Sequence, residues 1–324
     1  MSKSDPIEQA LEKLTGLRAL DNPALIGDKL SPFFVNRSNL VVAKAANIVR
    51  ENRLAQLVPE LITAFRRFMA DSPRLDKRCA AATQIAMALY ELDYCEPDIY
   101  LQGIRHVQLE ASFGPPVDVA AELRGVCAQG LVRTRYRHAL REVVQVLADD
   151  WTPARIGAVK ALATNGGEAG VLTLRLKALT GDADAEVMAE CFIALLAAER
   201  DDAIDFVAHF VESRSGELQD AAILALGSSG LSRAITFLRD KFEASVAGAA
   251  RKTLLLALAT SRQEDAMDYL LGLLEHAPPR TAADVISALA IHKVSDRVRG
   301  AVNQAVDRRR EPELLNTFRR EFTE

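Results

Sequence analysis

A motif of about thirty residues recurs five times in the second half of the chain and limits the folds available to it. Each copy holds an Ala-rich run, a polar turn and a bulkier apolar run. One leucine of the Ala-rich run recurs at intervals of 33, 31, 32 and 31 residues, at Leu162, Leu195, Leu226, Leu258 and Leu289. Self-similarity at this period is typical of solenoids, in which each repeat completes the core of its neighbours.

The spacing of apolar residues inside one copy predicts two helices. Leu218, Ala222 and Leu226 lie four residues apart, and Ile235, Leu238 and Phe242 follow at intervals of three and four. A hydrophobic content of 49% with only 17 glycines and 12 prolines in 324 residues also favours helices over sheets. We therefore expect an array of helical hairpins that bury their apolar faces against one another.

The junctions between a Leu-rich and an Ala-rich helix resemble those of the HEAT-repeat family, within the armadillo-like superfamily. The resembling segments are LSPFFVNRSNLVVAKAANIV (30–49), FMADSPRLDKRCAAATQIAMAL (68–89) and LKALTGDADAEVMAECFIALL (176–196). The resemblance implies an all-α, right-handed α-α superhelix of about eight to nine helical hairpins. It also implies that second helices line a concave face, where partners of this family usually bind.

The repeats are less regular in the first half of the chain, and this predicts four segments. They are an N-terminal capping helix (1–21), irregular HEAT-like repeats (22–150), regular repeats (151–307) and a C-terminal capping segment (308–324). An insertion near EASFGPPVD (110–118) accounts for the irregular spacing, as either a hinge or a packed element. Asp5 and Glu8 form a capping box for the first helix.

Charge and cysteine usage restrict the partners and the compartment. Forty basic and 44 acidic residues give a net charge of −4, which disfavours a dedicated nucleic-acid-binding module. The cysteines Cys79, Cys95, Cys127 and Cys191 are widely spaced, as expected of reduced, buried thiols. The sequence predicts a cytoplasmic location and no membrane association, since no apolar stretch is long enough to span a bilayer.

Charged residues on the expected second helices predict a binding surface of mixed charge, which suits another protein better than a polyphosphate backbone. These candidates are Lys44, Arg78, Arg124, Arg155, Lys160, Glu190, Asp220 and Arg251. An alternative site for an anionic partner is a stripe of Arg133, Arg137 and Arg141, spaced four apart as on one helical face. A solvated helix face is the simpler interpretation of that stripe.

The motifs of common enzyme and metal sites do not occur, and none of the five histidines pairs with a Cys or another His at a metal-ligand spacing. We expect no catalytic residues, metal or cofactor, and predict a non-catalytic protein-binding scaffold. Three alternatives stay open. Asp149 and Asp150 beside Trp151 would suit a DNA glycosylase-like protein; short HEAT-like repeats also occur in bilin lyases; and the end hairpins could mediate self-assembly, so the oligomeric state is open.

Overall fold

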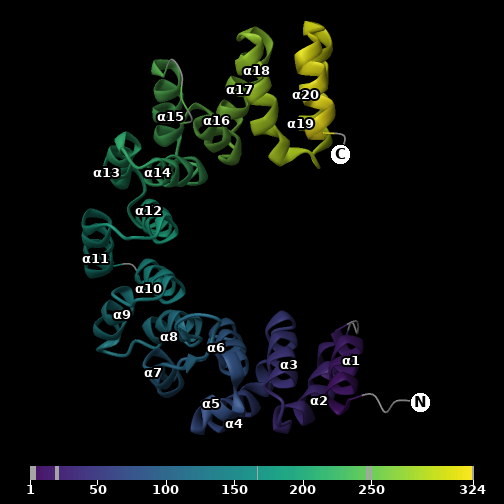
Figure 1. The fold of residues 1–324 in the computed structure, drawn as a ribbon, viewed down its shortest axis with the longest axis vertical. Helices are drawn as coiled ribbons and strands as arrows, with labels where there is room; N and C mark the ends of the chain where they lie inside the picture. Colours follow the sequence, from purple (N-terminus) through teal and green to yellow (C-terminus); the bar gives the residue numbers. More distant parts are fainter. Residues whose placement is uncertain (1–4, 19–21, 166, 246–247, 249, 323–324) are drawn as a thin grey trace. The chain divides into compact units, whose positions relative to one another are not determined.

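The computed structural model describes residues 5–18, 22–165, 167–245, 248 and 250–322. The described residues fall into two compact units, one within residues 1–170 and the other within 171–324. Figure 1 labels the helices of both units. The boundary falls inside helix α11 (Gly167–Thr180). Each unit is considered separately below.

The first unit consists of helices and one small hairpin of strands. Its 3-10 turns are Ser31–Val35, Ala55–Leu57 and Lys77–Cys79. Its α-helices and strands are α1 (Pro6–Arg18), α2 (Pro23–Leu30), α3 (Asn39–Glu51), α4 (Val58–Ala70), α5 (Ser72–Leu75), α6 (Ala80–Glu91), α7 (Pro97–Ile104), β1 (Leu109–Glu110), β2 (Val117–Asp118), α8 (Ala121–Arg133), α9 (Ala139–Leu147) and α10 (Thr152–Asn165).

Small residues let the Ala-rich helices of the first unit pack in sequence, with α3 against α6, α6 against α8 and α8 against α10. Helices α8 and α10 approach each other closely where Gly125 and Gly157 meet. A Cβ atom added to Gly157 would lie 2.2 Å from the Cα atom of Gly125. Helices α4, α7 and α9 pack against this row and complete the core.

The expected insertion is a short antiparallel hairpin between α7 and α8. Leu109 pairs with Asp118 and Glu110 pairs with Val117. Gln108 and Asp118 are buried at its base. Buried polar anchors of this kind fix the hairpin to the helices, so the insertion is a packed element at its base.

The second unit repeats the helix-pair arrangement with greater regularity. Its 3-10 turns are η4 (Arg200–Ala203), η5 (Phe210–Glu212) and η6 (Ala290–His292). Its helices after α11 are α12 (Ala185–Glu199), α13 (Ile204–His209), α14 (Gly216–Ser228), α15 (Ser232–Ala244), α16 (Ala250–Thr260), α17 (Glu264–His276), α18 (Pro279–Leu289), α19 (Asp296–Arg309) and α20 (Pro312–Phe322).

Four of the five recurring leucines lie on one row of packed helices in this unit, and the fifth, Leu162, lies on α10 of the first unit. Helices α12, α14, α16 and α18 pack successively against one another, and their repeat leucines are buried. Side-chain caps begin two of these helices, where Asp184 accepts a hydrogen bond from Glu186 N at 3.1 Å and Ser215 accepts one from Leu218 N at 3.5 Å. Asp and Ser side chains of the turns thus cap these helices by accepting bonds from backbone N–H groups.

The predicted all-α solenoid class is confirmed within both units. At the amino end, Asp5 Oδ1 accepts a hydrogen bond from Ile7 N at 3.0 Å, and this caps α1. Cys79, Cys127 and Cys191 are buried as expected, whereas Cys95 is exposed, because it lies in the turn that precedes α7. Among the described residues, no helix is both long and apolar enough to cross a membrane.

Candidate functional site

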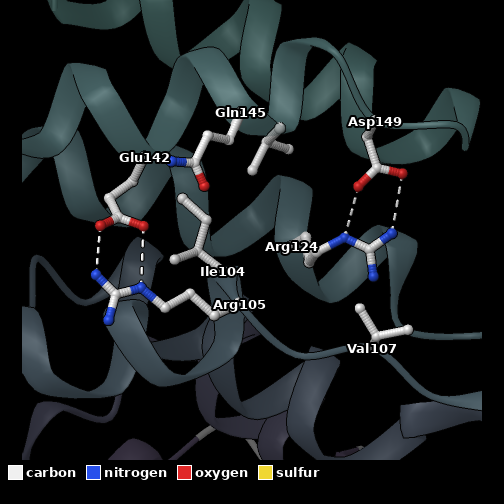
Figure 2. A pocket seen from close by; sticks show the side chains of 8 residues that line it. Ile104, Arg105, Val107, Arg124, Glu142, Gln145 and Asp149 are labelled. Atoms are coloured by element: carbon white, nitrogen blue, oxygen red, sulfur yellow. Dashed lines mark hydrogen bonds and ion pairs between the residues drawn. The ribbon is translucent and has the colours of Figure 1, made fainter.

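A pocket of about 260 Å³ opens on the first unit beside the hairpin. Its apolar walls are Ile104 at the end of α7, Val107 before β1 and Val146 on α9. Its polar walls are Arg105, Arg124, Glu142, Gln145 and Asp149. Figure 2 shows two ion pairs, Arg105 with Glu142 and Arg124 with Asp149, with Ile104 between them.

Arg124 is the central polar group of this site and is only 4% exposed. Its Nε and Nη2 atoms donate to Asp149 at 2.8 and 3.0 Å, in a bidentate arrangement. Its Nη1 atom donates to Asp118 Oδ2 at 2.6 Å and to the His106 carbonyl at 2.8 Å. Burial acts to lower the pKa of Arg124, but the hydrogen bonds to Asp149 and Asp118 outweigh it and raise that pKa.

The second ion pair lies at the solvent side of the pocket. Arg105 donates from Nε to Glu142 Oε2 at 3.0 Å and contacts the other carboxylate oxygen through Nη2. The hydrogen bond and charge of Arg105 lower the pKa of Glu142. Because the Arg105 side chain is 60% exposed, solvent screens this pair and limits its contribution to stability.

The hairpin is held by polar side chains that point into the protein. Gln108 N donates to Asp118 Oδ1 at 3.0 Å, and Gln108 Nε2 donates to the Asp76 carbonyl at 3.0 Å. Ser72 hydrogen-bonds to the Gln108 side chain, and Arg78 N donates to Glu110 Oε1 at 2.8 Å. These bonds join the hairpin to the turn before α6 and, through Asp118, to Arg124.

The apolar side chains of the same hairpin lie in solvent. Val107 is 61% exposed, Leu109 is 63% exposed and Phe113 at the tip is fully exposed. Val117 on the second strand is also exposed. The usual burial preference is therefore reversed here, with polar residues inside and apolar residues outside. We call Val107, Leu109, Phe113, Val117 and the adjoining pocket the hairpin surface.

The site combines apolar walls with charges that are neutralised within the chain. Its carboxylates accept hydrogen bonds from arginines of the same chain. No group of three or more His, Cys, Asp or Glu side chains suited to a metal ion occurs in the described part of the chain. An apolar side chain of a partner could contact Ile104, Val107 and Val146, while polar groups of the same partner contact the ion pairs at either side.

Of the candidates predicted on second helices, the pocket includes Arg124 alone. Arg155 on α10 is also buried, and its Nη1 atom donates to the carbonyls of Asp149 and Asp150 at 3.0 and 2.9 Å. Both arginines are thus buried and form their hydrogen bonds within the chain. Arg251 on α16 lies over the ring of Phe242, with the guanidinium carbon 3.9 Å from the ring centroid.

The other predicted candidates lie on different elements. Lys44 on α3 is half-buried and donates to the Leu11 carbonyl at 3.0 Å, which ties α3 to α1. Arg78 is exposed in the 3-10 turn before α6 and has a positive φ of 62°, so it is not on a regular second helix. Lys160 is exposed on α10. Glu190 and Asp220, in the second unit, are half-buried on α12 and α14.

The predicted arginine stripe is not one helical face. Helix α8 ends at Arg133 and α9 begins at Ala139, so Arg137 lies in the turn between them. Arg133 pairs with Asp93 and lies over the ring of Tyr90, and Arg137 Nε donates to His138 at 2.7 Å. A positive φ of 58° at Arg135 marks the break, which the spacing of four did not reveal.

The residues beside the single tryptophan also have structural roles. Asp149 accepts a hydrogen bond from Trp151 N at 2.9 Å while it holds Arg124. Four residues of the site were not predicted from the sequence, namely Asp118, Gln108, Arg105 and Glu142. The only signal for the first two was their position in the irregular segment near 110–118. Gln108 bonds to Ser72 and Asp76, 36 and 32 residues away. Asp118 bonds to Arg124 and Gln108, only 6 and 10 residues away, but in a segment that does not follow the repeat.

No protein-family model matches the chain, and no curated protein does. Among solved structures, the chain is similar to a chain in the complex of CpcE and CpcF of phycocyanin lyase from Nostoc sp. PCC7120. The identity is 18%, the match covers 75% of this chain and 93% of that chain, and the TM-score is 0.37. A likeness of this degree carries no conclusion about function.

Proposed function

We propose that this chain is a non-catalytic, HEAT-like scaffold that binds another protein, and that its hairpin surface forms part of the contact. One observation carries the proposal, namely the hairpin whose polar side chains are buried and whose apolar side chains lie in solvent. Gln108 and Asp118 hold the base of the hairpin, beside Leu109. Ser112 closes the tip that carries Phe113, because its hydroxyl donates to the Pro115 carbonyl at 2.7 Å and accepts from Gly114 N at 3.1 Å.

The exposed side chains would gain free energy in a protein interface. Burying a large aliphatic or aromatic side chain contributes about 1.5–3 kcal/mol, and interface centres are enriched in such residues. Because buried hydrogen bonds already fix the hairpin, binding has less chain entropy to overcome there. Phe113 at the tip and the pocket beside Val107 would then serve as a protruding anchor and a receiving site.

The charges around the pocket favour a protein over a nucleic acid at this surface. Arg105 is neutralised by Glu142, and Arg124 is neutralised by Asp118 and Asp149. A phosphate backbone would have to displace these carboxylates to use either arginine. Apolar contact with a protein side chain requires no such exchange.

The exposed or half-buried candidates Lys44, Arg78, Lys160, Glu190 and Asp220 remain proposed contributors elsewhere along the scaffold. The right-handed superhelix, the cytoplasmic location and the four predicted segments also stay predictions. So do the glycosylase-like, bilin lyase-like and self-assembly alternatives.

The test compares proteins retained from a lysate of the source cells by three immobilised forms: wild type, Phe113→Asp and Leu40→Asp. Leu40 is a matched control, because it is an apolar residue of the first unit that is 56% exposed on α3. The proposal predicts a protein retained by wild type and Leu40→Asp, with or without nuclease, and lost with Phe113→Asp. Unchanged retention by Phe113→Asp, or loss of retention after nuclease treatment, would refute it.

A further inference from the structure

Helix α11 carries a row of exposed leucines within the second unit. Leu172, Leu176 and Leu179 are 57%, 61% and 69% exposed, and their spacing places them on one side of the helix. Leu174 and Ala178, on the opposite side, are buried. We call the exposed row, Leu172, Leu176 and Leu179, the leucine face.

A helix that is apolar on two opposite sides is expected to have packing partners on both. The core of the second unit covers one side of α11 through Leu174 and Ala178. No other element that the structure describes in that unit buries the leucine face to a comparable extent. Three leucines at helical spacing form the kind of ridge that packs into the groove of a second helix. This geometry suits an α-helical partner.

The edge of the leucine face nearest η4 is acidic. Arg175, which adjoins Leu172 and Leu179 on the helix surface, reaches across this edge and lies over the ring of Phe206 at 4.6 Å. Its Nε atom donates to Glu199 at 2.8 Å, and Nη2 approaches the Asp202 carbonyl at 3.5 Å. Helix α11 is thereby held beside the start of η4.

Two carboxylates at this edge are available to a partner. Asp201 and Asp202 are exposed, and no ion pair involves their side chains among the residues that the structure describes. The nearby Arg233 is occupied by Asp205, to which it donates twice at 2.6 and 2.7 Å. Arg233 also interacts electrostatically with Asp201 and Asp202, and the exposed Arg200 begins the same turn. Two carboxylates against the one charge of Arg200 leave a net negative charge beside the leucine face.

We propose that the leucine face binds an amphipathic α-helix of another protein, whose apolar ridge is flanked by Lys or Arg residues facing Asp201 and Asp202. A second copy of this chain fits less well, because a symmetric pairing of leucine faces would bring two acidic edges together. The inference is independent of the function proposed for the hairpin surface, because it concerns other residues in the other unit.

The probes are two fluorescent helical peptides with the same Leu ridge, one flanked by Lys and the other by Glu, titrated with the full chain and followed by anisotropy. The Lys-flanked peptide is expected to bind at least about tenfold more tightly than the Glu-flanked one at low salt. Leu176→Asp should weaken binding about tenfold or more. Asp201→Asn with Asp202→Asn should weaken it about two- to fivefold and reduce its salt dependence.

Val294→Asp is the matched control, since Val294 is an apolar residue of the same unit that is 91% exposed far along the chain from α11. It should leave binding unchanged, as should Phe113→Asp, which separates this test from that of the hairpin surface. Equal binding of the two peptides, no binding, or binding unaffected by Leu176→Asp would overturn the inference. A concentration-dependent dimer that Leu176→Asp abolishes would also overturn it and assign the face to self-association.

Discussion

Replacement of Arg124 by Met tests whether the polar network behind the pocket holds the first unit together. Arg124 donates four hydrogen bonds, two to Asp149, one to Asp118 and one to the His106 carbonyl. Methionine fills much of the same volume but supplies no donor and no positive charge. The substitution leaves the Asp118 and Asp149 carboxylates without their arginine at side-chain exposures of only 3% and 15%.

The expected cost follows from the burial of those carboxylates. Removing one member of a buried, hydrogen-bonded ion pair typically destabilises a protein by about 3–5 kcal/mol. Asp118 keeps hydrogen bonds from the N–H groups of Gln108 and Ala120, and Asp149 keeps one from Trp151, so the lower half of that range is expected. We therefore expect Arg124→Met to lower the free energy of unfolding of the first unit by about 3–4 kcal/mol.

Trp151 provides the assay, because it is the only tryptophan in the chain and lies next to the network. Urea unfolding followed by its fluorescence reports the first unit. Arg105→Met is the control from the same pocket, and its solvent-exposed pair with Glu142 predicts a loss below about 1 kcal/mol. Equal losses for the two variants, or a loss below about 1 kcal/mol for Arg124→Met, would refute this account of the network.

Two further predictions concern packing and thiol chemistry. Gly157→Ala should destabilise the first unit by about 1–3 kcal/mol in the same Trp151 assay, because its Cβ would collide with the backbone of Gly125 on α8; an unchanged urea midpoint would contradict that close approach. One thiol per chain should react quickly with Ellman's reagent and disappear in Cys95→Ser. Cys95 is exposed, whereas burial raises the pKa values of Cys79 and Cys191 to about 12; two fast thiols would show that this burial is incorrect.

The repeat architecture could be predicted from the sequence because its signals are local and recur. Leu195, Leu226 and Leu258 occupy equivalent buried positions, and the apolar spacing of each helix is visible within one repeat. Turn residues such as Asp184 and Ser215 also indicate where the next helix begins, because they cap its first turn. Each repeat therefore predicts the same pair of helices independently of the others.

The candidate site could not be predicted in the same way, because its contacts join residues distant in the sequence. Arg124 was expected on a binding surface, yet Asp149 lies 25 residues away and draws it into the interior. The spacing of Arg133, Arg137 and Arg141 indicated one helical face, but Arg135 adopts a left-handed conformation that ends the helix. The hairpin has only two residues in each strand, too few for an alternating pattern to be recognised.

Site-specific photo-crosslinking tests the central claim most directly. A photoreactive phenylalanine analogue replaces Phe113 at the hairpin tip or, as the control, Leu40 on α3, and the cells that produce the full chain are irradiated. The account predicts a discrete heavier adduct between position 113 and one other protein, which is absent at position 40. No adduct at position 113, or the same adducts at both positions, would contradict the claim that the hairpin surface binds a protein partner.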